Sequence, residues 1–184
     1  MFLEKLEKLK KYPSDLILLI VAAIGIVILL TINILIFEPL AISVYEYGIL
    51  DFEFAWTREQ ILTIFTAWGA EGMALQAAGV YWDFLYIIGY TVPLFALILL
   101  VSRNLNDDML NIGLYMSLTP FIAGIFDIIE NINLLIMLNE ATTFASFVPF
   151  IASLSAMIKF GILIVGAIFF LVALILLVIK KINK

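Results

Sequence analysis

Long runs of hydrophobic residues alternate with short polar segments along the chain. The four longest runs cover about residues 16–37, 81–102, 109–138 and 148–179. Each run holds the roughly 20 apolar residues that a helix needs to cross the hydrocarbon core of a bilayer. The polar links at 103–108 and 139–143 are short, and short links place consecutive helices antiparallel and side by side. The pattern predicts an all-α polytopic membrane protein, an antiparallel bundle of four transmembrane helices that forms one domain over residues 1–184.

The longest segment outside these runs, residues 38–80, separates the first predicted helix from the second. Within it, Thr57 and Gln60 have the spacing of a capping box, in which two side chains satisfy backbone N–H groups at the start of a helix. The apolar residues that follow recur at helical spacing and share one face. We therefore predict an external interfacial helix over 58–67, lying on the bundle or on the membrane.

The first residues alternate lysines with Leu6 and Leu9 until Pro13 ends the pattern. Such a pattern is typical of a short amphipathic helix, which we expect on the inner membrane surface. The run at 16–37 is long and lacks a small-x-small cleavage motif, so we expect a membrane helix and not a signal peptide.

Positive charges are distributed unevenly between the two sides of the predicted bundle. One side carries Lys5, Lys8, Lys10, Lys11, Arg103, Lys180, Lys181 and Lys184. The other side carries only Arg58, together with most of the acids of the external segment. Because lysine and arginine stay on the cytoplasmic side, both termini are predicted to be cytoplasmic in a multi-pass protein of the cell membrane. The acidic outer face excludes nucleic acid as a partner.

The composition limits the available chemistry. The chain is 65% hydrophobic and only 14% charged, and it has no cysteine and no histidine. Disulfides, thiol relays, imidazole bases and the common zinc sites are therefore excluded. No cofactor is evident from the sequence, and a metal would have to be a hard cation held by oxygen, such as Mg²⁺, Mn²⁺ or Ca²⁺.

Polar residues interrupt all four apolar runs at one depth, in the outer half of the bilayer. They are Asn33 in the first helix, Asp83, Tyr86 and Tyr90 in the second, Asp127, Glu130 and Asn131 in the third, and Lys159 in the fourth. The spacing within the second and third helices places each set on one helical face. An ionised side chain inside the bilayer costs at least about 2.5 kcal/mol and is usually retained for a partner or a function.

Two interpretations of this polar layer stay open. Lys159 can pair with Asp127 or Glu130 as a structural ion bridge between helices. One lysine does not neutralise both of these acids and Asp83, however, so the excess negative charge is protonated, hydrated in a cavity, or matched by a bound cation. Asp127, Glu130 and Asp83 are also the candidate ligands for a divalent metal.

Three segments, LDFEFAW at 50–56, WDFLYIIGY at 82–90 and GIFDIIEN at 124–131, resemble an uncharacterised group of small four-helix integral membrane proteins of bacteria and archaea. Those proteins share an external LDFE segment and a D-x-x-E-N sequence in a helix. The resemblance implies no activity. It implies that Asp51 and Glu53 belong together with Asp83, Asp127, Glu130 and Asn131, and in the cavity hypothesis below we expect Asp51 and Glu53 at the rim.

Three functional hypotheses follow. The first is an acidic cavity that binds a small molecule, a lipid or a cation, with catalysis left open. In it Asp127 and Glu130 are the central acids, Tyr86, Tyr90 and Asn131 orient the ligand, and the external helix is a lid. The second is a proton or cation pathway. The third is a structural subunit whose polar layer mates with another copy of the chain or with a membrane partner.

Overall fold

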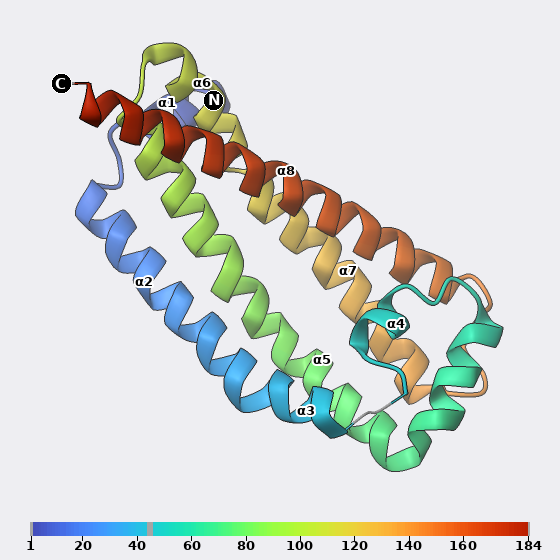
Figure 1. The fold of residues 1–184 in the computed structure, drawn as a ribbon. Helices are drawn as coiled ribbons and strands as arrows, with labels where there is room; N and C mark the ends of the chain where they lie inside the picture. The colour runs from blue at the N-terminus through green and yellow to red at the C-terminus, as the bar shows by residue number, and fades with distance from the viewer. Residues whose placement is uncertain (1, 44–45, 184) are drawn as a thin grey trace.

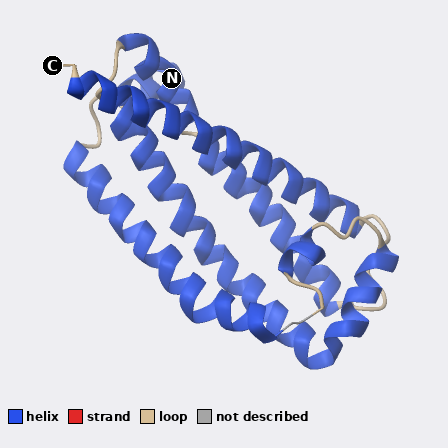
Figure 2. Ribbon diagram, in the orientation of Figure 1, coloured by secondary structure: helices blue, strands red, loops and turns tan. Residues whose placement is uncertain are grey.

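The structure is a computed structural model that describes residues 2–43 and 46–183. Its elements in chain order are α1 (Phe2–Lys8), α2 (Asp15–Ile32), the π-helical turn η1 (Asn33–Phe37), α3 (Glu38–Ser43), α4 (Ile49–Glu53), α5 (Arg58–Arg103), α6 (Asp107–Met116), α7 (Thr119–Asn139) and α8 (Val148–Ile182). The described residues form only helices and loops, as Figure 2 shows. The predicted all-α class is confirmed.

Four helical stretches are long and apolar enough to cross a membrane. They are Asp15–Ala41, Arg58–Arg103, Asp107–Asn139 and Val148–Ile182. In the bundle α2 packs on α5, α5 packs on α7, and α7 packs on α8 (Figure 1). Helix α1, helix α6 and the carboxyl end of α8 lie at one end, and α4 lies towards the other. This arrangement is the predicted four-helix antiparallel bundle.

The first span is longer than its hydrophobic run indicated, because α2 continues through η1 into α3. The backbone N–H of Glu38 bonds to the carbonyl of Asn33, five residues earlier, which is the widened π pattern. Pro39 follows directly and has no N–H to donate, and its ring crowds the preceding turn of a regular helix. The wider turn accommodates the proline and carries the helix to Ser43.

The external helix and the second span form one element with a sharp turn inside it. The capping box at Thr57 is confirmed: the Gln60 N–H donates to Thr57 Oγ1 at 3.3 Å, and the Thr57 N–H donates to Gln60 Oε1 at 3.1 Å. The chain turns at Gly69, whose φ of 62° is a conformation that other residues rarely adopt. The external helix therefore runs from Arg58 to the turn, and the second span begins well before residue 81.

The third span, predicted as one run over 109–138, is divided into α6 and α7. The break falls at Ser117 and Leu118, directly before Pro120 in the first turn of α7. Proline suits the first turn of a helix, where its missing N–H has no partner to lose. The Ser117 hydroxyl donates to the carbonyl of Leu114 at 2.8 Å and satisfies one of the carbonyls at the end of α6.

The amino-terminal helix α1 packs against the end of the bundle, and its position on the inner membrane surface stays a prediction. Leu6 is buried in a cluster with Leu18, Ala22, Ala96, Leu99 and Leu114. The Arg103 guanidinium donates to the carbonyls of Leu9 and Pro13 and to the carboxylate of Asp15. These bonds hold the first residues to the end of α5. Lys184, one of the lysines used to predict topology, lies outside the described residues.

The external segment forms a packed cap at the opposite end. Phe52 of α4 is fully buried and contacts the rings of Phe65 and Trp68, and Trp68 Nε1 donates to the carbonyl of Tyr47 at 2.8 Å. Arg58 Nη2 donates to a backbone carbonyl of the loop between α7 and α8 and lies over the Phe144 ring. The predicted external helix therefore lies on the bundle, and these contacts fix the position of α4.

Candidate ligand-binding cavity

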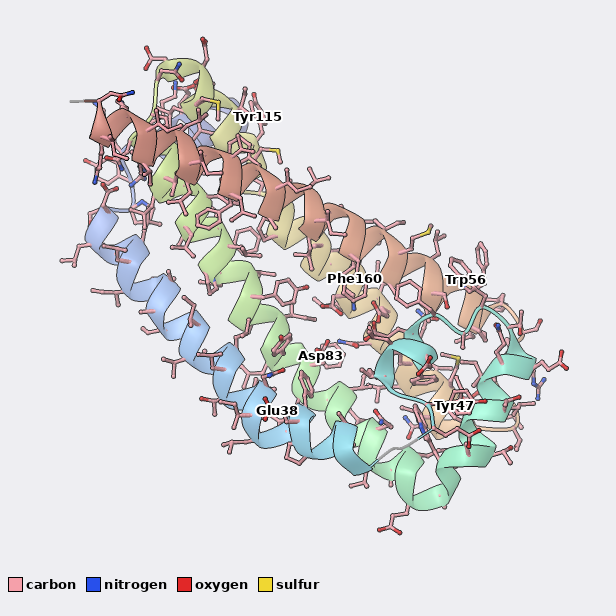
Figure 3. All side chains as sticks on the ribbon, in the orientation of Figure 1. Glu38, Tyr47, Trp56, Asp83, Tyr115 and Phe160 are labelled. Carbon is pink, nitrogen blue, oxygen red and sulfur yellow. The ribbon has the colours of Figure 1, made fainter. Side chains whose placement is uncertain are left out.

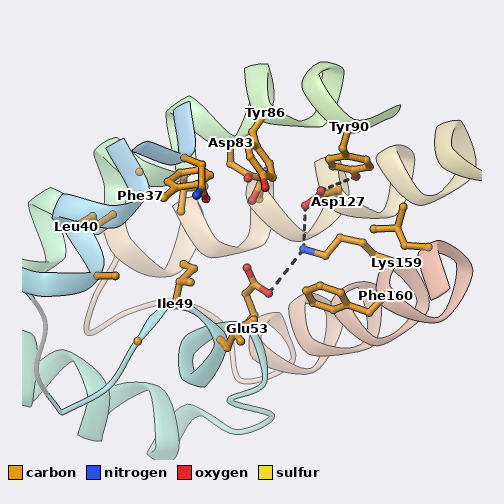
Figure 4. A pocket seen from close by; sticks show the side chains of 18 of the residues that line it. Phe37, Leu40, Ile49, Glu53, Asp83, Tyr86, Tyr90, Asp127, Lys159 and Phe160 are labelled. Carbon is orange, nitrogen blue, oxygen red and sulfur yellow. Dashed lines mark hydrogen bonds and ion pairs between the residues drawn. The ribbon is translucent and has the colours of Figure 1, made fainter. Parts of the chain in front are cut away.

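A cavity of about 700 Å³ lies among η1, α3, α4, α5, α7 and α8 (Figure 4). Its polar lining includes Asn33, Glu38, Glu53, Gln76, Asp83, Tyr86, Tyr90, Asp127, Asn131 and Lys159. Its apolar lining includes Phe37, Leu40, Ile49, Leu94, Phe160, Leu163 and Ala167. The structure thus brings together most of the polar layer that the sequence predicted, on the wall of one cavity.

Lys159 is the centre of an ion cluster at one end of the cavity. Its Nζ lies 3.0 Å from Asp127 Oδ1, 2.7 Å from Glu130 Oε2 and 3.7 Å from Glu53 Oε2. Lys159 is 5% exposed and Glu130 is fully buried, so these charges are largely removed from water. Removing a charge from water is costly unless an opposite charge is close, and the short distances here supply that partner.

Two hydrogen bonds extend the cluster to α5. The Tyr90 hydroxyl donates to Asp127 Oδ2 at 2.7 Å, so both oxygens of that carboxylate have donors (Figure 4). The Asn131 amide donates to Asp83 Oδ2 at 2.6 Å. Both bonds join α5 to α7, and they use the helical faces that the spacing of these residues predicted.

Glu53 is part of the ion cluster, although the cavity hypothesis placed it at the rim. Its side chain is 12% exposed and faces Lys159 from α4, a helix outside the four spans (Figure 4). Burial raises the pKa of the Glu53 carboxyl, and the nearby Lys159 ammonium opposes that rise. The buried Phe52 holds the segment that carries Glu53 inward, through contacts with the rings of Phe65 and Trp68. Periodicity in the sequence does not reveal such contacts, because they join residues of different elements.

Asp51 is not at the rim of the cavity, which corrects the prediction. Its carboxylate accepts the Gly48 N–H at 2.8 Å and caps the first turn of α4. The side chain is exposed, and Asp51 does not line the cavity. A carboxylate three residues into a helix is well placed for this capping role, so the acid stabilises the helix that presents Glu53.

Glu130 also does not line the cavity, although it was predicted to be a central acid. It lies behind Lys159, with no exposed surface. Glu130 Oε2 forms an ion pair with Lys159 Nζ, and the Glu130 carboxyl also faces that of Glu53. Glu130 therefore acts on the site through Lys159 and has no direct access to a ligand.

Sequence reasoning missed Gln76 and assigned no cavity role to Glu38. Gln76 is 2% exposed and lines the cavity from α5. It lies seven residues before Asp83, on the same helical face, and this spacing was the one signal that pointed to it. Glu38 lines the cavity from α3 and accepts a long, 3.5 Å hydrogen bond from the Asn33 amide. The first span continues past the apolar run that ends at residue 37, so the length of that run gave no reason to place Glu38 in the span.

The acids predicted as metal ligands have other partners. Asp127 and Glu130 face the Lys159 ammonium, and Asp83 accepts from the Asn131 amide. Over residues 2–43 and 46–183, no group of three or more acidic side chains is arranged to hold a metal ion. A lysine ammonium between carboxylates supplies the positive charge that a cation would otherwise bring.

The arrangement has a clear chemical character. One end of the cavity carries more carboxylates than ammonium groups, and the remainder is lined by aliphatic and aromatic side chains. Such a site suits a molecule with a polar group and an apolar body. No protein-family model, curated protein or solved structure matches the chain.

Proposed function

We propose that this chain is a membrane protein that binds an amphipathic small molecule or lipid in the cavity between α5 and α8. The observation that carries the proposal is the lining: carboxylates, amides and tyrosines at one end, and an aliphatic strip leading away from them. A ligand with a polar head and an apolar chain satisfies both parts at once.

The apolar strip supports binding of a hydrocarbon chain. On α8, Leu163 and Ala167 follow Lys159 at intervals of four residues, so all three share one face over about 12 Å. Leu94 lies on the facing α5 in the same relation to Tyr90. The first span packs on α5 and not extensively on α8 in the described part of the chain. No tight contact between the first and fourth spans therefore closes the strip off from lipid.

The same geometry supports the polar layer lying in the outer half of the membrane. Lysines flank the end of the bundle where α1 and the end of α8 lie, and Arg103 is at that end too. Arg58 is at the end that holds α4. By the preference of positive residues for the cytoplasm, the termini are cytoplasmic and the cavity is nearer the external face.

A proton or cation pathway has less support. Between the polar layer and the cytoplasmic end the bundle is filled by an apolar cluster that includes Leu18, Ala96, Leu99 and Leu114. A proton or ion needs polar groups or water along its route, and these side chains provide neither.

The proposal is tested by thermal unfolding of the purified protein in a neutral detergent. The ligands are dodecylamine, dodecanol and dodecanoate, which share one chain and differ in the head group. We expect at least one to raise the melting temperature in a saturable way, because a ligand that binds only the folded state stabilises it by mass action.

Two matched variants of α8 make the test specific for the cavity. Ala167→Phe fills the apolar strip and should abolish the stabilisation. Val165→Phe adds the same ring at a position that is 54% exposed, and it should leave the stabilisation by the ligand unchanged. If no amphiphile stabilises the wild type, or if both variants respond as the wild type does, the cavity is not a binding site.

A further inference from the structure

The polar layer has two parts that differ in how well their charges are matched. In the first part, Lys159 lies close to Asp127, Glu130 and Glu53. Three carboxylates surround one ammonium, so this part has no surplus positive charge to offer an anionic ligand. The second part lies across the cavity, on α3 and α5.

The second part contains two carboxylates without a cationic partner. The hydrogen-bond partners of Asp83 and Glu38 are the side-chain amides of Asn131 and Asn33, which carry no charge. In residues 2–43 and 46–183, no lysine or arginine lies within ion-pair distance of either acid. Both acids line the same cavity from neighbouring helices (Figure 3).

A buried acceptor that lines the same cavity gives independent support for a ligand. Gln76 is 2% exposed and lines the cavity, and its Oε1 has no hydrogen-bond partner among the described residues. A buried carbonyl oxygen without a donor costs about 1–3 kcal/mol, so such groups are rare in folded proteins. A hydrogen-bond donor that enters the cavity would satisfy it.

The surrounding rings are compatible with a positive charge. Tyr86 lies three residues after Asp83 and also lines the cavity, and its ring meets Phe37 edge to face at 5.0 Å between centroids. Aromatic faces attract cations, more strongly when water is excluded. Acids, an unpaired acceptor and aromatic rings thus occur together on one wall.

We propose that the head group of the ligand is an alkylammonium that carries N–H groups, bound between Asp83 and Glu38 with Gln76 as a further acceptor. This inference rests on the proposed function and names its ligand class. A primary ammonium supplies charge to the two carboxylates and hydrogen bonds to the acceptors. An alcohol supplies only one donor and no charge, and a carboxylate meets like charge.

The test measures apparent affinities from the ligand dependence of the melting temperature, with dodecylamine, dodecyltrimethylammonium, dodecanol and dodecanoate. We expect dodecylamine to bind at least about tenfold more tightly than the other three, the factor that one hydrogen bond to a charged group provides. Dodecyltrimethylammonium keeps the charge and the chain but has no N–H, so it separates hydrogen bonding from charge alone.

Two acid-to-amide variants locate the head group. Asp83→Asn should weaken dodecylamine binding about tenfold or more and leave dodecanol binding nearly unchanged. Glu71→Gln removes an acid that is exposed and outside the cavity, and it should change neither affinity.

The outcomes separate the two proposals. Stabilisation by dodecanol or dodecanoate equal to that by dodecylamine overturns the ammonium inference and leaves an amphiphile site standing. Equal binding of the primary and quaternary amines also overturns it, because hydrogen bonding then has no part. Failure of all four ligands overturns the proposed function itself.

Discussion

Replacing Lys159 by methionine is the sharpest perturbation of the polar layer. Methionine keeps much of the length and apolar surface of the lysine side chain but removes its charge. The ammonium lies within 3.0 Å of Asp127 and 2.7 Å of Glu130, and it is 5% exposed. Its loss leaves Asp127, Glu130 and the largely buried Glu53 without a counter-ion.

The expected cost follows from that burial. Removing one partner of a buried ion pair typically destabilises a protein by about 3–5 kcal/mol, because the remaining charge is uncompensated. The folded state of a domain is stable by only about 5–15 kcal/mol, so Lys159→Met should remove a large part of its stability. Glu130→Gln in the Lys159→Met background removes one orphan charge and should restore part of the loss, a coupling that a double-mutant cycle measures.

The assay is unfolding in mixed detergent micelles, followed by circular dichroism. Lys180→Met is the matched control, since that lysine is exposed and its Nζ donates to the carbonyl of Asn104. The control should change stability by no more than about 0.5 kcal/mol. If Lys159→Met unfolds together with the control, Lys159 is not the counter-ion of the buried acids, and our account of the cluster is refuted.

Three further predictions concern other parts of the fold. Burial raises the pKa of the Glu53 carboxyl in the folded state, so its protonated form stabilises the fold at low pH, and this stabilisation is lost as the pH rises through the folded-state pKa. The melting temperature of the wild type should therefore fall relative to that of Glu53→Gln as the pH rises above the ordinary pKa of glutamate. At Gly89 an added Cβ would lie 3.0 Å from a backbone nitrogen of α2, so Gly89→Ala should cost about 1–3 kcal/mol in thermal unfolding, whereas Gly161→Ala, with open space, should not destabilise. Because the chain has no cysteine, Asp108→Cys and Glu59→Cys report topology, and an impermeant maleimide added to intact cells should label only Glu59→Cys.

The sequence predicted the four spans and the common depth of their polar residues for clear physical reasons. Apolar run length sets how many helices cross a bilayer, and helical periodicity places Asp83, Tyr86 and Tyr90 on one face. Both patterns depend on local spacing. The bonds from Tyr90 to Asp127 and from Asn131 to Asp83 follow from these faces, once the helices are packed together.

The parts that the sequence did not predict depend on contacts between distant segments. Glu53 joins the ion cluster because Phe52 is buried among rings of the external helix, and no spacing within 49–53 indicates this. Asp51 looked equivalent to Glu53, yet it caps the helix that both residues share. The inward packing of α1 likewise depends on Arg103, at the far end of the second span.

The most direct test of the cavity is photolabelling in proteoliposomes with a dodecylamine that carries a diazirine in its chain. Mapping the label by peptide mass spectrometry should place it on the apolar strip, at Leu94, Leu163 and Ala167, and excess unlabelled dodecylamine should suppress it. Labelling confined to lipid-facing positions such as Val165 and Ile168, which are 54% and 57% exposed, and not reduced by competitor, would contradict a binding cavity in this bundle.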